Sequence, residues 1–487
     1  MNTPLAIEIV VGPHPRAWQA LIVSRLRAAG HQVSVSVTAT ERPWSPVVVG
    51  ILALERLVFR RQSSLAAAAE RLEHATVSLP VALRLDLTGS AGAGEVPCLT
   101  LAFDGSATAL AAASTLAAGR LPELELRLDG GLVAIAAPMV DKRFLVSAGL
   151  DDVLARAVTL TLSTVARFAA GTLGAPIPRP PAAGRTPSFI GPYLTSALPR
   201  LLRETLRRTR FQFAHWRVGY RFVDGPGAES GRLGDGWIVL PDDGQRFFAD
   251  PFPFIWQNRS FIFVEDYAHA AGKATISVVE IAPDGHASVP REVLAEPYHL
   301  SYPQVFARDG AIWMLPEGSG GGELVLYRAE QFPDHWVRDT ILFSGRQLSD
   351  ATLLEHDGRL WLFATDRDGH GSTSDTLVVF FATDLRGPWV AHPMNPITID
   401  RAAARPGGSF VRSGKTVLLP VQDGTLGYGG GLGLAELLEL TTSAVRMAPP
   451  VPIAAAGDWP YPQIHTLNRA GRLEVIDGIV AMPKGPR

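Results

Sequence analysis

The stretch Phe247-Phe-Ala-Asp-Pro-Phe-Pro-Phe-Ile-Trp-Gln-Asn-Arg-Ser-Phe-Ile-Phe-Val-Glu265 decides the fold of the C-terminal part of this chain. It consists of two short apolar runs around a central turn of Gln, Asn and Arg, which is typical of a β-hairpin. The first run opens on a polar residue, Asp250, beside Pro251, and the second run ends on an acid, Glu265. The hairpin therefore has a recognisable start and a recognisable end.

The same pattern returns four more times. Each copy opens on a polar residue near Pro or Ala and ends on an acid or amide, and the copies span 301–317, 349–366, 404–423 and 462–477. Their anchor residues are 52, 48 and 55 residues apart, and are Asp250, Tyr302, Asp350 and Arg405. A period of about 50 residues built from short strands predicts a β-propeller with one four-stranded sheet per blade.

The fifth copy lacks outer strands of its own, because little chain remains after 473–476. Two candidate strands precede the first copy, at 215–221 and 236–240. We expect them to complete the fifth blade, so that the ring closes with strands from both ends and leaves no exposed edge. The fold class is therefore multidomain, with an all-β five-bladed propeller over residues 214–487.

Several motifs of this region carry a family resemblance. The segments Ala249-Asp-Pro-Phe and Ser349-Asp-Ala-Thr-Leu resemble glycoside hydrolase family 43. Taken with Ser301-Tyr-Pro-Gln-Val-Phe, Arg405-Pro-Gly-Gly and His465-Thr-Leu-Asn, the region 210–487 looks more similar to the N-terminal propeller of glucosamine inositolphosphorylceramide transferases. The resemblance implies a protein that hydrolyses or transfers a glycosyl unit during synthesis of a surface polysaccharide or glycolipid.

The resemblance also implies a catalytic set. First residues of inner strands point into a propeller's channel mouth, so we expect Asp250 and Asp350 to face one cavity. By resemblance, Asp250 is the general base and Asp350 tunes the acid, and an inverting glycosidase holds such carboxyl groups about 6.5–9.5 Å apart. The alternative interpretation is that each Asp caps a turn by bonding nearby backbone amides.

Blade four departs from the family pattern, because Arg405 stands where the family has its acidic Glu. Glu317 is the substitute that we assign as catalytic, and Glu265 is a second acid that we assign to substrate binding. An Arg that faces two carboxylates lowers their pKa values and favours an anion-binding channel over proton donation. The sequence therefore leaves the identity of the acid open.

Three further residues are candidates for substrate contact. Arg405 is expected to bind an anionic sugar, and Tyr302 is expected to stack on a sugar ring. His465 either donates to a sugar hydroxyl or phosphate, or bonds backbone across the ring closure. Trp313 and Trp361 lie in the middle of strands and are interpreted as blade core.

Three functions follow from these residues. The first is a glycan-acting enzyme with its site at the channel mouth, and the second is a glycan-binding or scaffold module that serves a partner glycosyltransferase. The third, which rests on the N-terminal region described next, is residual formyl transfer, and it would require binding of a folate cofactor. We predict no cofactor and no metal site for the first two functions.

Residues 1–170 alternate strand and helix signals and predict a doubly wound α/β domain. The order of elements resembles the formyltransferase fold, through 6–29, 85–87, 99–105 and 124–170. That family needs an Asn, a His and an Asp, but the segment Leu101-Ala-Phe-Asp-Gly105 has no His and no preceding Asn. We therefore expect a degenerate domain. No Gly-x-Gly-x-x-Gly follows the first strand, which argues against a dinucleotide site.

The region between the domains has two parts. Residues 171–192 are rich in Pro and Gly and predict a linker, and 193–213 predict an amphipathic helix that packs on the next domain, with five arginines on its polar side. A surface for anionic lipid is the alternative interpretation of this helix. A net charge of −2 gives no reason to expect nucleic acid as a partner. One cysteine, no signal peptide and no transmembrane run lead us to expect a cytoplasmic protein.

Overall fold

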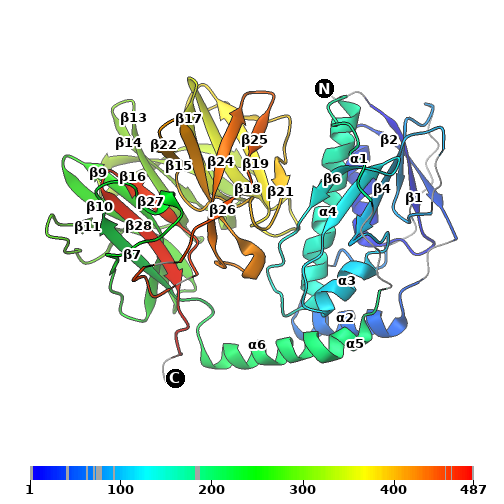
Figure 1. The fold of residues 1–487 in the computed structure, drawn as a ribbon, viewed down its shortest axis with the longest axis horizontal. Coiled ribbons are helices and arrows are strands. Elements are labelled where there is room, and N and C mark those ends of the chain that lie inside the picture. The colour runs from blue at the N-terminus through cyan, green and yellow to red at the C-terminus, as the bar shows by residue number, and fades with distance from the viewer. Residues whose placement is uncertain are drawn as a thin grey trace. The chain divides into compact units, whose positions relative to one another are not determined.

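The computed structural model describes residues 4–484 except 40–42, 62–63, 70–71, 73–78, 91–93, 181–186, 456 and 462. The chain forms two compact units, shown in Figure 1. One comprises Met1–Leu206 together with His370–Ser372, and the other comprises Arg207–Gly369 and Thr373–Arg487. Part of the predicted linker, 181–186, and the fifth repeat anchor, at 462, lie outside the described residues.

The first unit is a mixed six-stranded sheet. Its strand order is β2 (Gln32–Val37), β1 (Ala6–Val11), β3 (Leu83–Asp86), β4 (Cys98–Phe103), β5 (Leu124–Leu128) and β6 (Gly131–Ala136). The β2–β1, β1–β3 and β3–β4 pairs are parallel, and the β4–β5 and β5–β6 pairs are antiparallel. Its longest helix, α4 (Val146–Ala169), contacts α1 (Ala17–Ala28), α2 (Pro46–Val58) and α3 (Leu110–Ala117). The α/β prediction is confirmed, and the likeness to formyltransferases stays a prediction.

Two helices of this unit, α2 and α3, were not predicted. The apolar run that forms α2 begins at a Ser45 cap, whose side chain accepts from the Val47 amide, and Pro46 occupies the first turn. Its Glu55 is buried and accepts from the Ser147 amide and the Tyr193 hydroxyl, each at 2.8 Å. No helix of the described chain is long and apolar enough to cross a membrane.

A helical run follows the linker and begins earlier than predicted. It consists of α5 (Ile190–Pro192), a π-helical turn (Tyr193–Ala197) and α6 (Leu198–Arg210). Arg200 of α6 donates to the Leu116 carbonyl of the first unit. Leu202 and Leu206 are 62% and 52% exposed, so these two leucines do not form the buried stripe that the sequence predicted.

The second unit is a propeller of five sheets. Blade one consists of β9 (Arg246–Trp256), β10 (Arg259–Ala268), β11 (Lys273–Ile281) and β12 (Arg291–Leu294). Blade two consists of β13 (Ser301–Arg308), β14 (Ala311–Glu317), β15 (Glu323–Gln331) and β16 (His335–Ser344). Blade three consists of β17 (Leu348–His356), β18 (Arg359–Asp366), β19 (Thr376–Ala382), β20 (Val390–Ala391) and β21 (Thr398–Ile399). Blade four consists of β22 (Val411–Ser413), β23 (Thr416–Gln422), β24 (Leu432–Leu440), β25 (Val445–Met447) and β26 (Val451–Pro452).

Blade five is built from both ends of the unit, as predicted. Its strands are β27 (Leu467–Ala470), β28 (Leu473–Ile479), β7 (Trp216–Phe222) and β8 (Ile238–Val239). Strand β28 pairs with β27 on one side and with β7 on the other, both antiparallel, as Figure 1 shows. The five-bladed ring and its mode of closure are therefore confirmed.

Apolar cores lie between neighbouring blades. Trp313 belongs to the core between blades two and three, and Trp361 to the core between blades three and four. Both side chains are less than 5% exposed. The interpretation of these tryptophans as blade core is confirmed.

The start of the first strand is irregular in three blades. Asp250, Tyr302 and Asp350 have φ angles of +47°, +48° and +49°, in the left-handed region that non-glycine residues seldom adopt. At each of these positions the pairing with the second strand shifts register. A bulge of this kind changes the direction of the side chain at its position. It therefore affects the orientation of the repeat anchors Asp250, Tyr302 and Asp350.

A buried ion pair links the two ends of the propeller in blade five, and its contribution to stability can be tested. Glu474 of β28 is fully buried, and its carboxylate accepts from Arg221 Nη2 of β7 at 2.6 Å and from the Ala228 amide at 2.7 Å. We expect Glu474→Ala to lower the free energy of unfolding of the propeller by about 3 kcal/mol, because it leaves the Arg221 charge buried without its partner. Urea unfolding followed by tryptophan fluorescence measures this change.

The matched control is Asp224, whose ion pair with Arg472 joins the same two parts of blade five at the surface. Asp224→Ala is expected to change the free energy of unfolding by less than about 0.5 kcal/mol. Equal effects of the two variants would show that the buried pair does not hold the ring closed.

Candidate functional site

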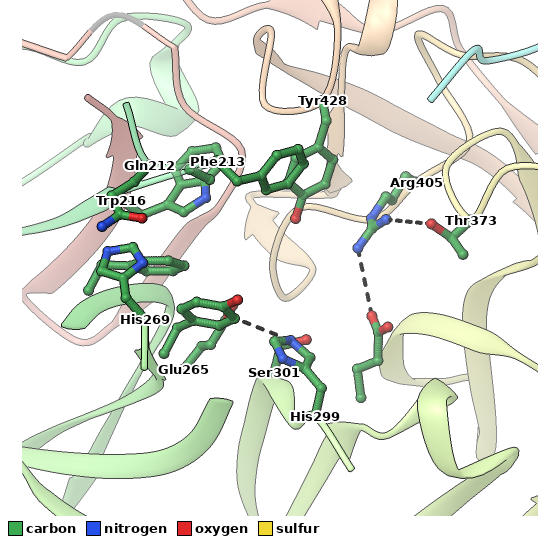
Figure 2. A pocket seen from close by; sticks show the side chains of 14 residues that line it. Gln212, Phe213, Trp216, Glu265, His269, His299, Ser301, Thr373, Arg405 and Tyr428 are labelled. Carbon is green, nitrogen blue, oxygen red and sulfur yellow. Dashed lines mark hydrogen bonds and ion pairs between the residues drawn. The ribbon is translucent and has the colours of Figure 1, made fainter. Parts of the chain in front are cut away.

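A pocket of about 390 Å³ lies where the five blades meet. All five blades contribute to its lining, through residues that include Trp216, Glu265, Glu317, Thr373 and Arg405. Figure 2 shows Arg405 beside Thr373 on one side of the pocket, with Trp216 and His269 on the opposite side. The pocket is therefore the mouth of the propeller's central channel.

Acids of the second strands face this pocket. Glu265 pairs with Ala249 and lies three residues before the end of β10, and Glu317 ends β14 opposite Ser301. Both line the pocket, although they are only 7% and 9% exposed. The sequence assigned Glu317 to catalysis and Glu265 to substrate binding, and the structure brings the two together.

The two predicted catalytic aspartates do not line the pocket. Asp250 and Asp350 are 3% and 1% exposed and lie among buried polar groups. The expectation that both would face one cavity is wrong, because neither lines the pocket: Asp250 bonds to Thr466, and Asp350 bonds to Arg405 and Gln422. The turn-cap interpretation is wrong as well, since their partners Thr466 and Arg405 are 216 and 55 residues away.

Asp350 holds Arg405 in a two-pronged ion pair. Arg405 Nε lies 2.6 Å from Asp350 Oδ2, and Nη2 lies 3.1 Å from Oδ1. Gln422 donates to the same carboxylate at 2.7 Å. Burial alone would lower the pKa of Arg405, but the charges of Asp350, Tyr428 and Glu317 raise it well above its ordinary value. Arg405 is therefore a permanent cation.

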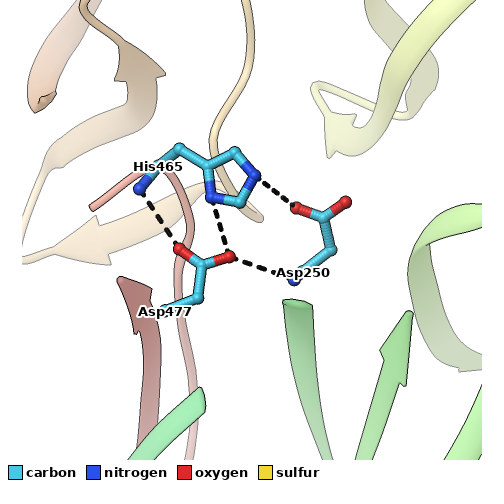
Figure 3. Close-up of side chains that lie close together, drawn as sticks. All are labelled: Asp250, His465 and Asp477. Carbon is cyan, nitrogen blue, oxygen red and sulfur yellow. Dashed lines mark hydrogen bonds and ion pairs between the residues drawn. The ribbon is translucent and has the colours of Figure 1, made fainter. Parts of the chain in front are cut away.

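Asp250, His465 and Asp477 form a second buried cluster, shown in Figure 3. His465 Nδ1 lies 2.7 Å from Asp477 Oδ2, and Nε2 lies 3.4 Å from Asp250 Oδ1. The ring of Trp216 stacks on the imidazole with centroids 3.8 Å apart. Burial alone would lower the pKa of His465, but the two carboxylates raise it above its ordinary value. His465 thus bonds neither to the pocket nor to backbone across the ring closure through its imidazole.

The same three side chains have the donor types of a metal site. Each offers one ligand atom, and these atoms lie within 4.8 Å of one another. A protonated imidazole and a bound cation exclude each other at this place, because both use the same nitrogen lone pair. The repeat pattern did not predict this group, because it marked Asp477 only as the end of the fifth repeat.

The surroundings of Glu265 and Glu317 act on their pKa values in opposite directions. Burial raises the pKa of Glu265 well above its ordinary value, and the carboxyl groups of Asp250, Glu317 and Asp477 raise it further. Burial would also raise the pKa of Glu317, but Arg405 and hydrogen bonds to its carboxylate lower it. Its donors are Ser319, Ser349 and the Asp350 amide, at 2.7, 3.2 and 3.2 Å. Glu265 is thus the carboxyl group of the pocket that holds its proton more tightly, and Glu317 the one that ionises more readily.

Tyr302 does not reach a ligand. It is fully buried, and its hydroxyl lies 2.8 Å from Thr352 Oγ1 and accepts from the Gly408 amide at 2.7 Å. The predicted role as a stacking platform is wrong, because the side chain is fully buried and does not line the pocket. Exposed aromatic rings at the pocket are instead those of Phe213 and Tyr428, at 72% and 45% exposure.

Sequence reasoning missed several lining residues. Phe213 follows the end of α6, and Tyr428 lies in the glycine-rich segment 427–431 that was interpreted only as a turn. His269 and His299 lie just beyond blade-one strands, outside the repeated hairpins. The one available signal was composition, because an aromatic or His residue in an irregular connection is a frequent ligand contact.

The family comparison matches part of the propeller. Residues 241–454 match the family model described as glucosamine inositolphosphorylceramide transferase 1, N-terminal. The transferase 1 of Oryza sativa subsp. japonica is 33% identical over 218 residues, which are 43% of this chain and 29% of the relative. That of Arabidopsis thaliana is 30% identical over 206 residues, which are 41% and 27%. The resemblance to this N-terminal region is confirmed, and the chain spans less than a third of these relatives.

Solved structures with some likeness include carbohydrate-active enzymes. An exo-β-1,3-galactanase from Clostridium thermocellum is 14% identical with a TM-score of 0.35, over 49% of this chain and 60% of the other. The catalytic domain of an α-L-arabinofuranosidase from Coprinopsis cinerea is 16% identical with a TM-score of 0.36, over 53% and 85%.

The buried imidazole gives a pH-dependent prediction. His465 binds its proton more tightly in the folded state than in the unfolded state, where its pKa is about 6.5. Its contribution to stability is therefore complete below about pH 6.5 and is lost as the pH rises through the raised folded pKa. We expect the difference in free energy of unfolding between the wild type and His465→Gln to shrink from about pH 6 to about pH 9, measured by urea unfolding.

His392 is the matched control, because it is 2% exposed and its Nε2 lies 2.9 Å from the Thr441 carbonyl, with no carboxylate partner. Burial lowers the pKa of His392. The wild type should therefore gain stability relative to His392→Gln over the same rise in pH. The same trend for both variants would contradict a protonated His465.

Proposed function

We propose that the propeller is a carbohydrate-active protein that hydrolyses or transfers a glycosyl unit in the channel-mouth pocket. The observation that carries the proposal is the pair Glu265 and Glu317, two carboxyl groups in one pocket with pKa values shifted in opposite directions. Titratable groups whose surroundings separate their pKa values are the usual basis of acid and base roles.

The roles follow from the protonation states. Glu265 gives its proton to the oxygen that leaves the sugar, and Glu317 faces the positive charge that develops at the anomeric carbon of an oxocarbenium-like transition state. Asp250 supports the protonated form of Glu265 through its own charge, and Asp350 holds Arg405 beside Glu317, whose Oε2 lies 3.7 Å from Arg405 Nη2. The two aspartates act beneath the pocket in this scheme, while the glutamates contact the substrate.

The rest of the lining suits a sugar. The exposed rings of Phe213 and Tyr428 offer apolar faces to a pyranose ring. Ser301, Thr373 and His299 offer polar groups for its hydroxyls. A volume of about 390 Å³ falls within the range of about 300–1,000 Å³ that small-molecule sites occupy.

The names of the relatives support the same substrate class. They are described as glucosamine inositolphosphorylceramide transferases, and we propose that this chain acts on a glycolipid or a surface polysaccharide. The match covers less than a third of each relative. We therefore do not assign the specific transfer reaction in their names to this chain.

One observation favours a second function. Arg405, held by Asp350 in a two-pronged ion pair, stands at the place where a family-43 enzyme has its acid, and the two repeat-anchor aspartates are buried. A propeller with this arrangement suits a non-catalytic module that holds a glycan while a partner glycosyltransferase performs the chemistry.

A panel of aryl glycosides and a glycan array separate the two functions. With the sugar that the array identifies, we expect wild-type turnover and a loss of about 10²–10⁴-fold in kcat for Glu265→Gln. The dissociation constant of the glycan is expected to stay within about threefold, because the amide keeps the size of the acid. Steady-state kinetics and isothermal calorimetry measure both quantities.

The control is Glu355→Gln, since the Glu355 side chain is 65% exposed and pairs with Arg308 outside the pocket. It should leave kcat unchanged. Glycan binding by the wild type without turnover on any glycoside would make the propeller a binding module. Full turnover by Glu265→Gln would remove Glu265 from the role of acid.

A further inference from the structure

A chain of three side chains outside the carboxyl cluster ends in the pocket. It runs from Asp242 through His215 to His269, and the last of these lines the pocket. Asp242 Oδ2 contacts His215 Nε2 at 3.2 Å and Arg217 Nη1, and Oδ1 accepts from the Gly244 amide at 2.7 Å. Arg217 and the Gly244 amide can only donate, and a carboxylate offers only acceptor oxygens, so we infer that His215 Nε2 donates to Asp242 as well.

This carboxylate fixes the protons of both imidazoles. His215 Nε2 must carry a hydrogen to bond to Asp242, so the Nδ1 of a neutral His215 has a lone pair. That Nδ1 lies 3.1 Å from His269 Nε2. His269 Nε2 must therefore carry the hydrogen of this bond, which leaves the lone pair of His269 on Nδ1.

The packing keeps this arrangement in place. His215 is fully buried, its ring stacks on that of His269 with centroids 5.4 Å apart, and the edge of Phe247 contacts both rings. His269 is only partly buried, and within the described residues no hydrogen bond engages its Nδ1. The ring of the neighbouring Tyr267 meets that of His269 edge to face, with centroids 5.7 Å apart. The lone pair on His269 Nδ1 is thus available at the pocket, and the contacts of the ring fix its orientation.

The charges around His269 favour its neutral form. Burial lowers the pKa of His269, and His215 lowers it further, while Asp242 and Asp243 oppose the change. Burial likewise lowers the pKa of His215, against the charge of Asp242 and with that of Arg217. Both imidazoles are therefore neutral around pH 7, which is the state that the hydrogen-bond directions require.

We propose that His269 is the base that takes the proton from the hydroxyl that attacks the sugar, and that His215 and Asp242 are positioning residues that fix its tautomer. This proposal rests on the proposed function and adds the group that Glu265 and Glu317 leave unassigned. The attacking group is a water or an alcohol of the acceptor, because hydrolysis or transfer to a glycan joins an O–H oxygen to the anomeric carbon and a bare imidazole nitrogen can accept that proton.

The step balances as follows. A bond forms between the acceptor oxygen and the anomeric carbon while the bond to the leaving oxygen breaks. The acceptor proton moves to His269 Nδ1, and the Glu265 proton moves to the leaving oxygen. An imidazolium at His269 is then stabilised through His215 by the Asp242 carboxylate, as in other carboxylate-held catalytic imidazoles.

The first test needs no substrate. In the ¹⁵N NMR spectrum of the wild type with labelled histidines, His269 is expected to carry its hydrogen on Nε2 and none on Nδ1 at pH 7. The loss of one set of signals in His269→Gln assigns the residue. A hydrogen on Nδ1 in the wild type overturns the proposal, whatever the enzyme's activity.

A pair of variants tests the positioning. In Arg217→Gln the carboxylate of Asp242 remains, so the tautomer of His269 should be unchanged. Adding Asp242→Asn lets an amide N–H donate to His215 Nε2, which should reverse both imidazoles and place a hydrogen on His269 Nδ1. An unchanged tautomer in the double variant overturns the role of Asp242, with thermal unfolding confirming that the protein is folded.

Kinetics test the base itself on the glycoside identified above. His269→Gln should lower kcat by about 10²–10³-fold with KM within about threefold, and should remove the fall of kcat at low pH that follows protonation of His269. His286→Gln is the control, because that side chain is 88% exposed and lies outside the pocket lining. An unchanged kcat in His269→Gln overturns the base role. If the wild type has no turnover, the base role falls with the proposed function, while the tautomer measurement still reports separately on the hydrogen-bonded chain.

Discussion

Five carboxyl groups lie buried around the axis of the propeller, and the structure there depends on how their charges are balanced. Asp250, Glu265, Glu317, Asp350 and Asp477 are all less than 10% exposed. Buried charges need partners, and two cations supply most of them. Arg405 pairs with Asp350 and approaches Glu317, and His465, whose pKa the two neighbouring carboxylates raise, lies between Asp250 and Asp477. Glu265 instead contacts His299, whose Nε2 lies 3.5 Å from Glu265 Oε1. Burial lowers the pKa of His299 and raises that of Glu265, so this contact favours an uncharged pair at the pocket surface.

The repeat pattern was strong enough to predict the ring. Five copies of one hairpin at a regular period allow few other folds, and the missing outer strands of the last copy pointed to the strands before the first one. The same pattern placed Glu265 and Glu317 at equivalent hairpin ends. It failed at Asp250, Tyr302 and Asp350, because a bulge with positive φ breaks the alternation of side chains on which any argument from strand period depends.

The rest of the site comes from segments without a period. His269, Phe213, Thr373 and Tyr428 lie in connections whose course is set by packing against distant parts of the ring. The chain from Asp242 to His269 joins residues on both sides of the first strand of blade one, and no spacing rule links them. Trp216 is an example. In the sequence it is an ordinary strand residue, but in the structure its ring stacks on the imidazole of His465. The Arg405 substitution was visible in the sequence, and its pairing with a carboxylate followed from charge alone.

The closure of blade five also has a consequence for the order of events during synthesis. Arg221 and Glu474 are 253 residues apart in sequence, and ribosomes add about 5–20 residues per second. Strand β7 therefore waits roughly 10–50 s for its partner to emerge, with one hydrogen-bonding edge unpaired during that time. Until β28 arrives, Trp216 has no His465 to stack on and the pocket has no complete wall. The nascent propeller is thus exposed to edge-to-edge association in a way that the finished ring is not, and a chaperone that shields β7 would act in this interval.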